Sequence, residues 1–475
     1  MTIAPVDPAA RADARADAGG IQRFRAMLEQ VAGPAIASLE SPVAVDLIAA
    51  LEELKSTVCA AQAVLSVALD TAERDRQAVA GVPARRRGQG VAAQVGLARR
   101  ESPHRGSVLL GAAKVWTAEM PHTFAALRAG RLSEYRAMIL VAETACLERE
   151  DRAEVDRLLC ADPATLDGVG TRALAALARG HAARLDPSAV VRRARRAEGE
   201  RRVSIRPAPD TMCYLSALVP MKHGIAAFAA LKTAADLART TQGGDPRGHG
   251  QIMADTLIQR ITGLADPDDI PVTVNLVLSD TTLLGAGHDP AHLDTPGTSP
   301  APVPAQIARE LIAAGLDTHA VWLRRLYADP HGQLVAMSTT QRFHPDGLAT
   351  FLRLRDQGIC RTPYCGAPIR HIDHITPAAA GGPTDATNSQ GLCEACNHTK
   401  QAPGWTQTLT PETHQHTVVT TTPTGHRYAS HAPPPSTPAP QPSRDEPETG
   451  RRVVDLAFER LLATHAPIEY ERRAA

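Results

Sequence analysis

The stretch "HIDHITPAAAGGPTDATNSQGLCEACNHTK" (residues 371–400) decides the fold of the C-terminal part of this chain. It begins with a short apolar segment that carries Asp373 and His374 and stops before Pro377, which favours a brief strand. A Gly-Gly-Pro turn leads into a second short segment, and a helix is expected from about Leu392. The predicted order is therefore strand, loop, strand, helix.

Two close cysteine pairs bracket this stretch. Cys360 and Cys365 precede it, and Cys393 and Cys396 lie near its end, with 27 residues between the pairs. Zinc takes four ligands in tetrahedral geometry, and two cysteines three positions apart share one face of a helix. The spacing predicts one closed, structural Zn²⁺ site, because a site with four cysteine ligands leaves no position for a substrate. The alternative is that the four cysteines are reduced core residues.

The residues between and around the pairs resemble the HNH nuclease module, also called the ββα-metal fold. The matching elements are "DHITP", the Gly-Gly turn, Asn388, "GLCEACN" and Lys400, together with the two cysteine pairs, over about 45–50 residues. The resemblance implies hydrolysis of phosphodiester bonds in DNA by a metal-dependent endonuclease.

The resemblance also assigns roles to individual residues. His374 matches the general base, and Asn388 matches the residue that braces the loop and orients that histidine. Asp373 matches one ligand of a catalytic ion, and Asn397 matches the second, with His398 as the alternative on the same helix. Oxygen ligands suit Mg²⁺ or Mn²⁺ for this catalytic ion.

The charge of the chain gives little support for a global attraction to nucleic acid. Lys and Arg number 51, Asp and Glu also number 51, and the net charge is about zero. Contacts with DNA must then be local, and Arg361, Arg370 and Lys400 are the candidates near the site. Two other functions stay open: a zinc-stabilised nucleic-acid-binding module without turnover, and an interaction protein whose cysteine knuckle only organises the C-terminus.

The N-terminal two thirds of the sequence is helical in pattern. Hydrophobic residues make up 43% of the chain but aromatic residues only 3%, so Ala, Leu and Val must build the core. Apolar residues recur at steps of three and four over residues 47–68, and helices are expected up to about residue 264. Alternation over residues 271–280 then predicts a strand, and residues 305–316 a helix.

Several N-terminal stretches, among them "MPHTFAALRAGRLSEYRAMIL" and "GDPRGHGQIMADTLIQRITG", resemble domain of unknown function 222, which is common in actinobacteria and often precedes an HNH module. The family's function is not established, so the resemblance implies a helical fold without a mechanism. We expect this region to position substrate, bind a partner or form a homo-oligomer. No export signal or membrane-spanning stretch stands out, so we expect no contact with a membrane and a cytoplasmic protein.

The sequence thus predicts a mainly α fold: a large helical N-terminal region with a small strand-containing subdomain, then a compact ββα-metal zinc module. The expected divisions are a weakly ordered N-terminus (1–40), a helical domain (41–340), the HNH module (345–405), a hairpin extension (406–430), a Pro-rich disordered linker (431–450) and a C-terminal helix (451–475).

Overall fold

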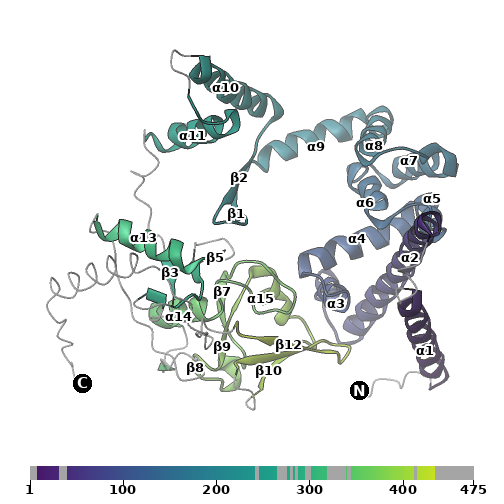
Figure 1. The fold of residues 1–475 in the computed structure, drawn as a ribbon. Coiled ribbons are helices and arrows are strands. Elements are labelled where there is room, and N and C mark those ends of the chain that lie inside the picture. Colours follow the sequence, from purple (N-terminus) through teal and green to yellow (C-terminus); the bar gives the residue numbers. More distant parts are fainter. Residues whose placement is uncertain are drawn as a thin grey trace. The chain divides into compact units, whose positions relative to one another are not determined.

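The computed structural model describes residues 8–31, 40–240, 245–264, 275–278, 282–283, 287–294, 301–317, 338–339, 344–410 and 415–433 (Figure 1). Backbone contacts divide the chain into two compact units. The first comprises residues 1–65 and 114–186, and the second comprises residues 66–113 and 187–475. Each unit is therefore assembled from segments that are not contiguous in sequence.

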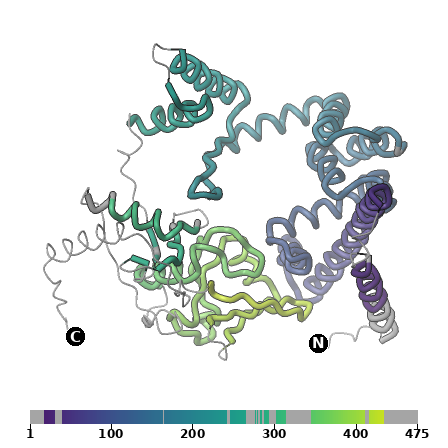
Figure 2. The backbone as a smooth tube through the Cα atoms, viewed as in Figure 1, coloured from purple at the N-terminus to yellow at the C-terminus, as the bar shows by residue number. Residues whose placement is uncertain are grey.

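The first unit is made of helices packed around leucines and one tryptophan. Its elements are α1 (Pro8–Val31), the first part of α2 (Ser41–Val79), the end of α4 (Pro103–Glu119), α5 (Pro121–Arg128), α6 (Glu134–Glu143), α7 (Arg149–Cys160), the short η3 (Pro163–Leu166) and α8 (Thr171–Leu185) (Figure 2). α5 packs on α7, and α6 packs on α8. Each of these four helices contributes a buried leucine: Leu127, Leu140, Leu159 and Leu174.

One detail of this unit differs from the sequence-based expectations. The stretch expected to be weakly ordered (1–40) contains α1, because its alanine-rich sequence favours a helix. The helical sequence of residues 111–130 is divided into α4 and α5 at Met120 and Pro121. Proline fits the first turn of a helix but not its interior, so a new helix begins there.

Asp156 of α7 caps the N-terminus of α5 from a different helix. Its carboxylate accepts hydrogen bonds from the amides of His122 and Thr123 and from the Thr123 hydroxyl, at 2.5 to 2.8 Å. The local N-cap residue, Met120, supplies no side-chain acceptor. The buried aspartate therefore satisfies two amides that the helix itself leaves without partners.

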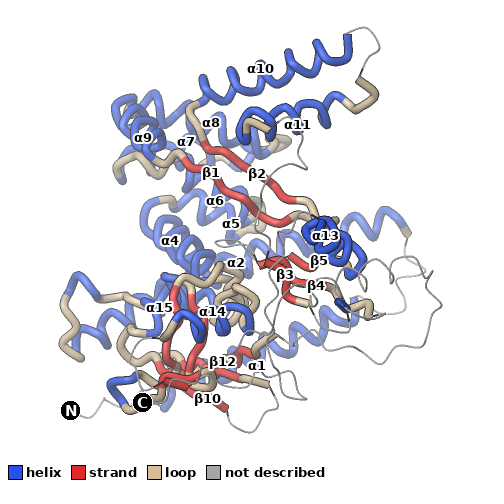
Figure 3. The backbone as a smooth tube through the Cα atoms, turned by 90° about the vertical axis from the view of Figure 1, so that its left-hand side faces the viewer, coloured by secondary structure: helices blue, strands red, loops and turns tan. Residues whose placement is uncertain are grey.

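The second unit begins with helices and one pair of strands. Its elements here are the end of α2, η2 (Ala84–Arg86), α3 (Val91–Ala98), the start of α4, α9 (Pro187–Gly199), β1 (Arg202–Pro207), β2 (Cys213–Leu218), α10 (Met221–Thr240) and α11 (His249–Thr262). β1 and β2 pair in antiparallel register, and α10 packs along α11 (Figure 3).

The expectation of uninterrupted helices up to about residue 264 is wrong over residues 202–218. The β-branched Val203 and Ile205 alternate with polar residues, a pattern that favours a strand. Asp210 and Thr211, both with positive φ, form the turn that brings β2 back beside β1. The arginine-rich sequence of residues 192–202 comes directly before this alternation and has the polar character of a helix surface, so the strand was not expected.

A small strand-containing part follows, as predicted. β3 (Asn275–Val277), β4 (Ala291–Asp294) and β5 (Ala301–Val303) form an antiparallel sheet next to α13 (Ala305–Asp317). Ala291, Val303 and Ala308 are buried together between the sheet and this helix. β6 (Ser338–Thr339) pairs with a strand of the C-terminal module. The sequence also favours a short strand near residues 334–337, which lies outside the described residues.

The C-terminal module contains α14 (Asp346–Arg355), β7 (His371–His374), η5 (Ala378–Ala380), β8 (Thr384–Asp385), β9 (Ser389–Leu392), α15 (Glu394–Lys400), β10 (Thr406–Thr410), β11 (Thr417–Thr421) and β12 (Arg427–His431). β7 and β9 are antiparallel, α15 follows and contacts β7, and β10–β12 form a three-stranded sheet (Figure 1). The strand–loop–strand–helix order and the helical N-terminal region confirm the predicted fold class.

α14 is fixed to β9 by a buried charged pair. The Arg355 guanidinium donates to Asp356 and to the carbonyls of Ala386 and Ser389, at 2.6 to 3.0 Å. Asp356 in turn accepts the amide of Gly391 at 2.8 Å. Leucine and phenylalanine side chains of α14 also pack on the loop before β9. The helix is therefore an integral part of the module, and Arg355 is not available to a phosphate.

α3 packs directly on the C-terminal module. Ala93 and Leu97 of this helix form one buried cluster with Ala402 and Trp405, which follow α15. Gly90, at the start of α3, has φ +86°, and a Cβ there would lie 2.5 Å from the indole nitrogen of Trp405. Helical sequence from residues 66–113 and the ββα module thus share a hydrophobic core.

Across the described part of the chain, none of the helices combines the length and the apolar character needed to traverse a lipid bilayer. The linker expected over 431–450 lies outside the described residues from residue 434 on, and His431, its first residue, ends β12. The helix expected over 451–475 also lies outside the described residues.

We predict that Asp156→Ala loosens the N-terminus of α5, because three donors, two of them buried, lose one shared acceptor. The expected loss is about 2 kcal/mol locally, or roughly thirtyfold faster hydrogen exchange of the α5 amides. Mass spectrometry of deuterium uptake measures it. Glu154→Ala, which removes an exposed ion pair on the same helix, is the matched control and should leave these rates unchanged. Equal exchange in both variants would contradict the capping role.

Candidate functional site

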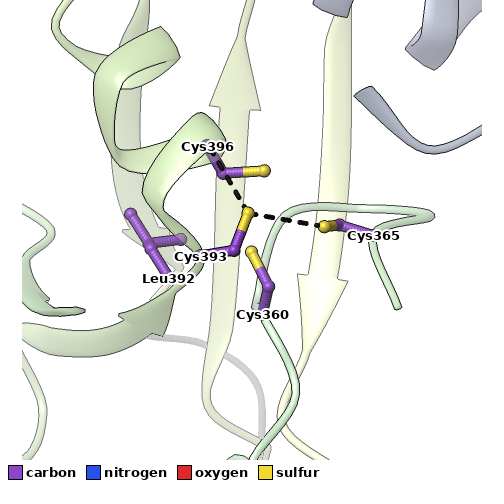
Figure 4. Close-up of a cluster of buried hydrophobic side chains, with 5 residues drawn as sticks. All are labelled: Cys360, Cys365, Leu392, Cys393 and Cys396. Atoms are coloured by element: carbon purple, nitrogen blue, oxygen red, sulfur yellow. Dashed lines mark hydrogen bonds between the residues drawn. The ribbon is translucent and has the colours of Figure 1, made fainter. Parts of the chain in front are cut away.

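Four buried cysteine side chains converge on one point between the start of α15 and the loop before β7 (Figure 4). The sulfur atoms of Cys360, Cys365, Cys393 and Cys396 all lie within 4.8 Å of one another. The sulfurs of Cys365 and Cys393 are 3.8 Å apart. Four sulfurs held about 2.3 Å from a tetrahedral Zn²⁺ are separated by about 3.8 Å, so this donor set fits zinc.

Local backbone geometry brings each pair together. The first knuckle closes through hydrogen bonds from the Cys360 amide to the Ala367 carbonyl and from the Cys365 amide to the Thr362 carbonyl. Cys393 is the N-cap of α15, and its sulfur accepts the Cys396 amide at 3.5 Å. Hydrogen bonds from the other three thiols and from this amide lower the pKa of the Cys393 thiol below its usual range.

An open pocket of about 420 Å³ lies at the end of β7. Asp373 and His374 both line it, together with His344, Lys400 and residues of the loop after β7. Adjacent strand residues ordinarily face opposite sides, but β7 ends at His374, so both side chains reach one pocket. The Nε2 atom of His374 is hydrogen-bonded to the Thr384 hydroxyl at 2.9 Å.

Asn388 holds the loop that follows β7. Its side-chain oxygen accepts the Thr376 amide at 2.9 Å, and its side-chain nitrogen donates to the carbonyls of Thr376 and Pro383. Gly382 packs against this bridge: a Cβ there would lie 2.0 Å from the Thr376 carbonyl oxygen. Asn388 therefore bridges Thr376 and Pro383 across the loop, and the second glycine of the turn is required by close contact.

Lys400 reaches back from α15 to the end of β7. Its ammonium group donates to the Asp373 carboxylate and to the His374 carbonyl. Only 11% of the lysine side chain is exposed. The ammonium group thus contacts two oxygen atoms at the end of β7, and the lysine side chain points toward Asp373 rather than toward solvent.

The two candidate helix ligands differ in burial. The side-chain oxygen of Asn397 is buried and, among the described residues, has no hydrogen-bond partner. His398, one position further, is exposed. A buried carbonyl oxygen without a partner is costly unless something binds it. Neither Asn397 nor His398, however, is among the residues that line the pocket with Asp373 and His374.

The two arginine candidates lie in contrasting environments. Arg361 is buried, its guanidinium donates to the carbonyls of His416 and Ser430 at 3.0 Å, and burial lowers its pKa to about 10. The expectation that Arg361 contacts nucleic acid does not fit these surroundings. The buried guanidinium faces the carbonyls of His416, just before β11, and of Ser430 in β12, and not solvent. Arg370 is exposed just before β7.

Sequence reasoning missed three residues around His374. The His344 ring lies 4.5 Å from the His374 ring, centroid to centroid, and its Nε2 atom is hydrogen-bonded to the Ser389 hydroxyl at 2.8 Å. Burial, then the nearby His374, lowers the pKa of His344. Ser389 and Thr384 are both buried. No motif spacing marks His344, since it precedes α14; only a conserved role across relatives or the fold itself could identify it.

The comparisons with known proteins agree with both resemblances. Residues 48–356 match the family described as "Domain of unknown function (DUF222)", and residues 360–402 match the family described as "HNH endonuclease". No solved structure matches the chain.

Two relatives come from Mycobacterium tuberculosis: uncharacterized protein MT2160 of strain CDC 1551 / Oshkosh and uncharacterized protein Rv2100 of strain ATCC 25618 / H37Rv. Each is 34% identical over 151 residues, which are 31% of this chain and 24% of the relative. The match thus spans about a quarter of each relative's length. Because the first family match covers more than half of the sequence, the protein belongs to the DUF222 family, and it carries an HNH endonuclease domain after that region.

Proposed function

We propose that this chain is a metal-dependent, HNH-type endonuclease that hydrolyses phosphodiester bonds in DNA. The observation that carries the proposal is the meeting of Asp373 and His374 in one open pocket, beside a loop that Asn388 braces. The HNH match over residues 360–402 supports the reaction class.

His374 is the proposed general base. Its imidazole accepts a proton from water as the water oxygen bonds to phosphorus and the bond from phosphorus to the 3′ oxygen breaks. Imidazole suits this role because it titrates near neutral pH. The Thr384 hydroxyl fixes one ring nitrogen, and the Asn388 bridge fixes the loop that forms the adjacent wall of the pocket.

Asp373 and Asn397 are the proposed ligands of a divalent ion, Mg²⁺ or Mn²⁺, with His398 as the alternative. When bound, such an ion neutralises charge on the scissile phosphate and the leaving oxygen. Two observations support the fit: Asn397 has a buried oxygen without a partner, and the Asp373 carboxylate already contacts a cation, the Lys400 ammonium group. Oxygen donors are the ligands that these ions prefer.

The Lys400–Asp373 ion pair also favours a second candidate function. If the lysine keeps the carboxylate occupied, the pocket binds no catalytic ion, and the chain is a zinc-stabilised nucleic-acid-binding module without turnover. Under either function, Arg370 is the exposed arginine we propose for phosphate contact near the pocket. Lys400 reaches a phosphate only after leaving Asp373. Homo-oligomerisation through the helical region stays a prediction.

We further propose that the four cysteines hold one structural Zn²⁺ ion. Their burial and their mutual distances support this, because four buried sulfur atoms within 4.8 Å of one another can surround one zinc ion. The ion would join the knuckle before β7 to the first turn of α15 and so fix the two elements that flank the pocket.

We predict that His374→Ala lowers the rate of nicking of supercoiled plasmid, with Mg²⁺ or Mn²⁺ present, by about a hundredfold or more, because water loses its proton acceptor. His371→Ala, at the exposed start of β7, is the matched control. Equal activity of the wild type and His374→Ala would remove His374 as the base. Retained DNA binding without cleavage by the wild type would favour the binding module.

Asn397→Ala should raise the metal concentration needed for half-maximal cleavage by about tenfold or more, because it removes one oxygen ligand. His398→Ala should leave that concentration unchanged. Titration of cleavage rate against Mn²⁺ compares the two variants. If His398→Ala raises that concentration and Asn397→Ala does not, His398 is the ligand on α15.

The purified chain should contain about one zinc ion, measured by plasma mass spectrometry. Cys393→Ser should lose it and unfold the module, because structural zinc supplies folding free energy directly. Cys213→Ser changes an exposed cysteine of β2 and should retain the metal. Absence of zinc from the wild type would overturn the structural site.

A further inference from the structure

His344 lies against the proposed base although 30 positions separate the two in the sequence. The two imidazole rings are 4.5 Å apart between centroids and tilted by 42°, and both line the same pocket. His344 belongs to the DUF222 match, which ends at residue 356, and lies outside the HNH match, which begins at residue 360. The pocket is therefore a joint product of the two matched regions.

The two histidines are held by buried hydroxyl groups. Ser389 stands directly opposite His374 in the register of β7 and β9, and cross-strand partners present their side chains to the same face. The Ser389 hydroxyl binds Nε2 of His344, while the Thr384 hydroxyl binds Nε2 of His374. Ser389 is fully buried and Thr384 nearly so. The His374 ring is thus contacted by the His344 ring, and its Nε2 atom is separately hydrogen-bonded to Thr384.

The backbone that carries His344 is also fixed. Pro345 follows it directly as the N-cap of α14, and α14 is tied to β9 through the hydrogen bonds of Arg355 and Asp356. Because β9 also carries Ser389, the support for the His344 ring and the anchor of its helix come from the same strand. Such an arrangement fixes a ring far better than an isolated loop does.

We propose that His344 is a positioning residue for His374: its ring packs against the imidazole and restricts it to the orientation that faces the pocket. The last segment of the DUF222 region then completes the active site of the HNH module. The catalytic consequence rests on the proposed function, whereas the positioning itself does not.

The test labels histidine Cε1 with ¹³C in the full-length protein and follows the His374 signal by NMR, assigned with His374→Gln. His344→Ala, which removes the packed ring, should shift and broaden this signal as His374 samples more orientations. His344→Phe, which keeps an aromatic face but loses the bond to Ser389, should restore a single sharp signal. His371→Ala should leave it unchanged. An identical His374 signal in the wild type and His344→Ala overturns the proposal.

Nicking kinetics on the same variants give the second readout. His344→Ala should lower kcat roughly ten- to hundredfold with little change in KM, since a misplaced base slows chemistry and not binding. His344→Phe should recover most of that loss. A wild type without nuclease activity, but with the expected NMR response, would support the positioning role and overturn the proposed function. Unchanged kcat in His344→Ala, with wild-type cleavage present, overturns the positioning role.

Discussion

The convergence of four cysteine sulfurs is the constraint on which the C-terminal module depends. It joins the knuckle at Cys360 to the N-cap of α15 at Cys393 and so closes a loop that contains β7, β8 and β9. Leu392 is fully buried beside the sulfurs. A small domain cannot rely on hydrophobic burial alone, and a Zn²⁺ ion held by the four sulfurs, as proposed, would add a cross-link at this point.

Short-range contacts between β7, the loop that follows it and Asn388 form the pocket next in the chain. β7 stops at His374, the Asn388 side chain replaces the missing backbone ladder, and Gly382 allows the loop to approach within contact distance. The polar residues that surround the pocket are therefore held by hydrogen bonds within the module. Among its described residues, Asn397 shares with Arg361, Gln390, Trp405 and His416 a buried side-chain atom that has no hydrogen-bond partner.

Local sequence spacing was enough to predict the cysteine cluster and the strand–loop–strand–helix order, because each depends on residues close together in the chain. The bracing role of Asn388 came from the resemblance to the HNH module and not from spacing. Features that depend on distant segments were not accessible. Arg361 looks like any surface arginine in sequence, and only β11 and β12 enclose it. His344 reaches the pocket because Arg355 and Asp356 fix α14 on β9, and no periodicity encodes that contact. The β1–β2 pair was not predicted, because the arginine-rich residues before β1 have the pattern of an exposed helix.

The packing of α3 on Trp405 has a practical consequence for anyone who cuts this chain into pieces. A fragment that begins at the knuckle or at α14 would carry the ββα module without Ala93 and Leu97, leaving the indole and Ala402 uncovered. Uncovered aromatic surface promotes self-association. A faithful fragment of the module must therefore bring residues from near position 90 with it, and the boundary between the matched families is not a boundary between folding units.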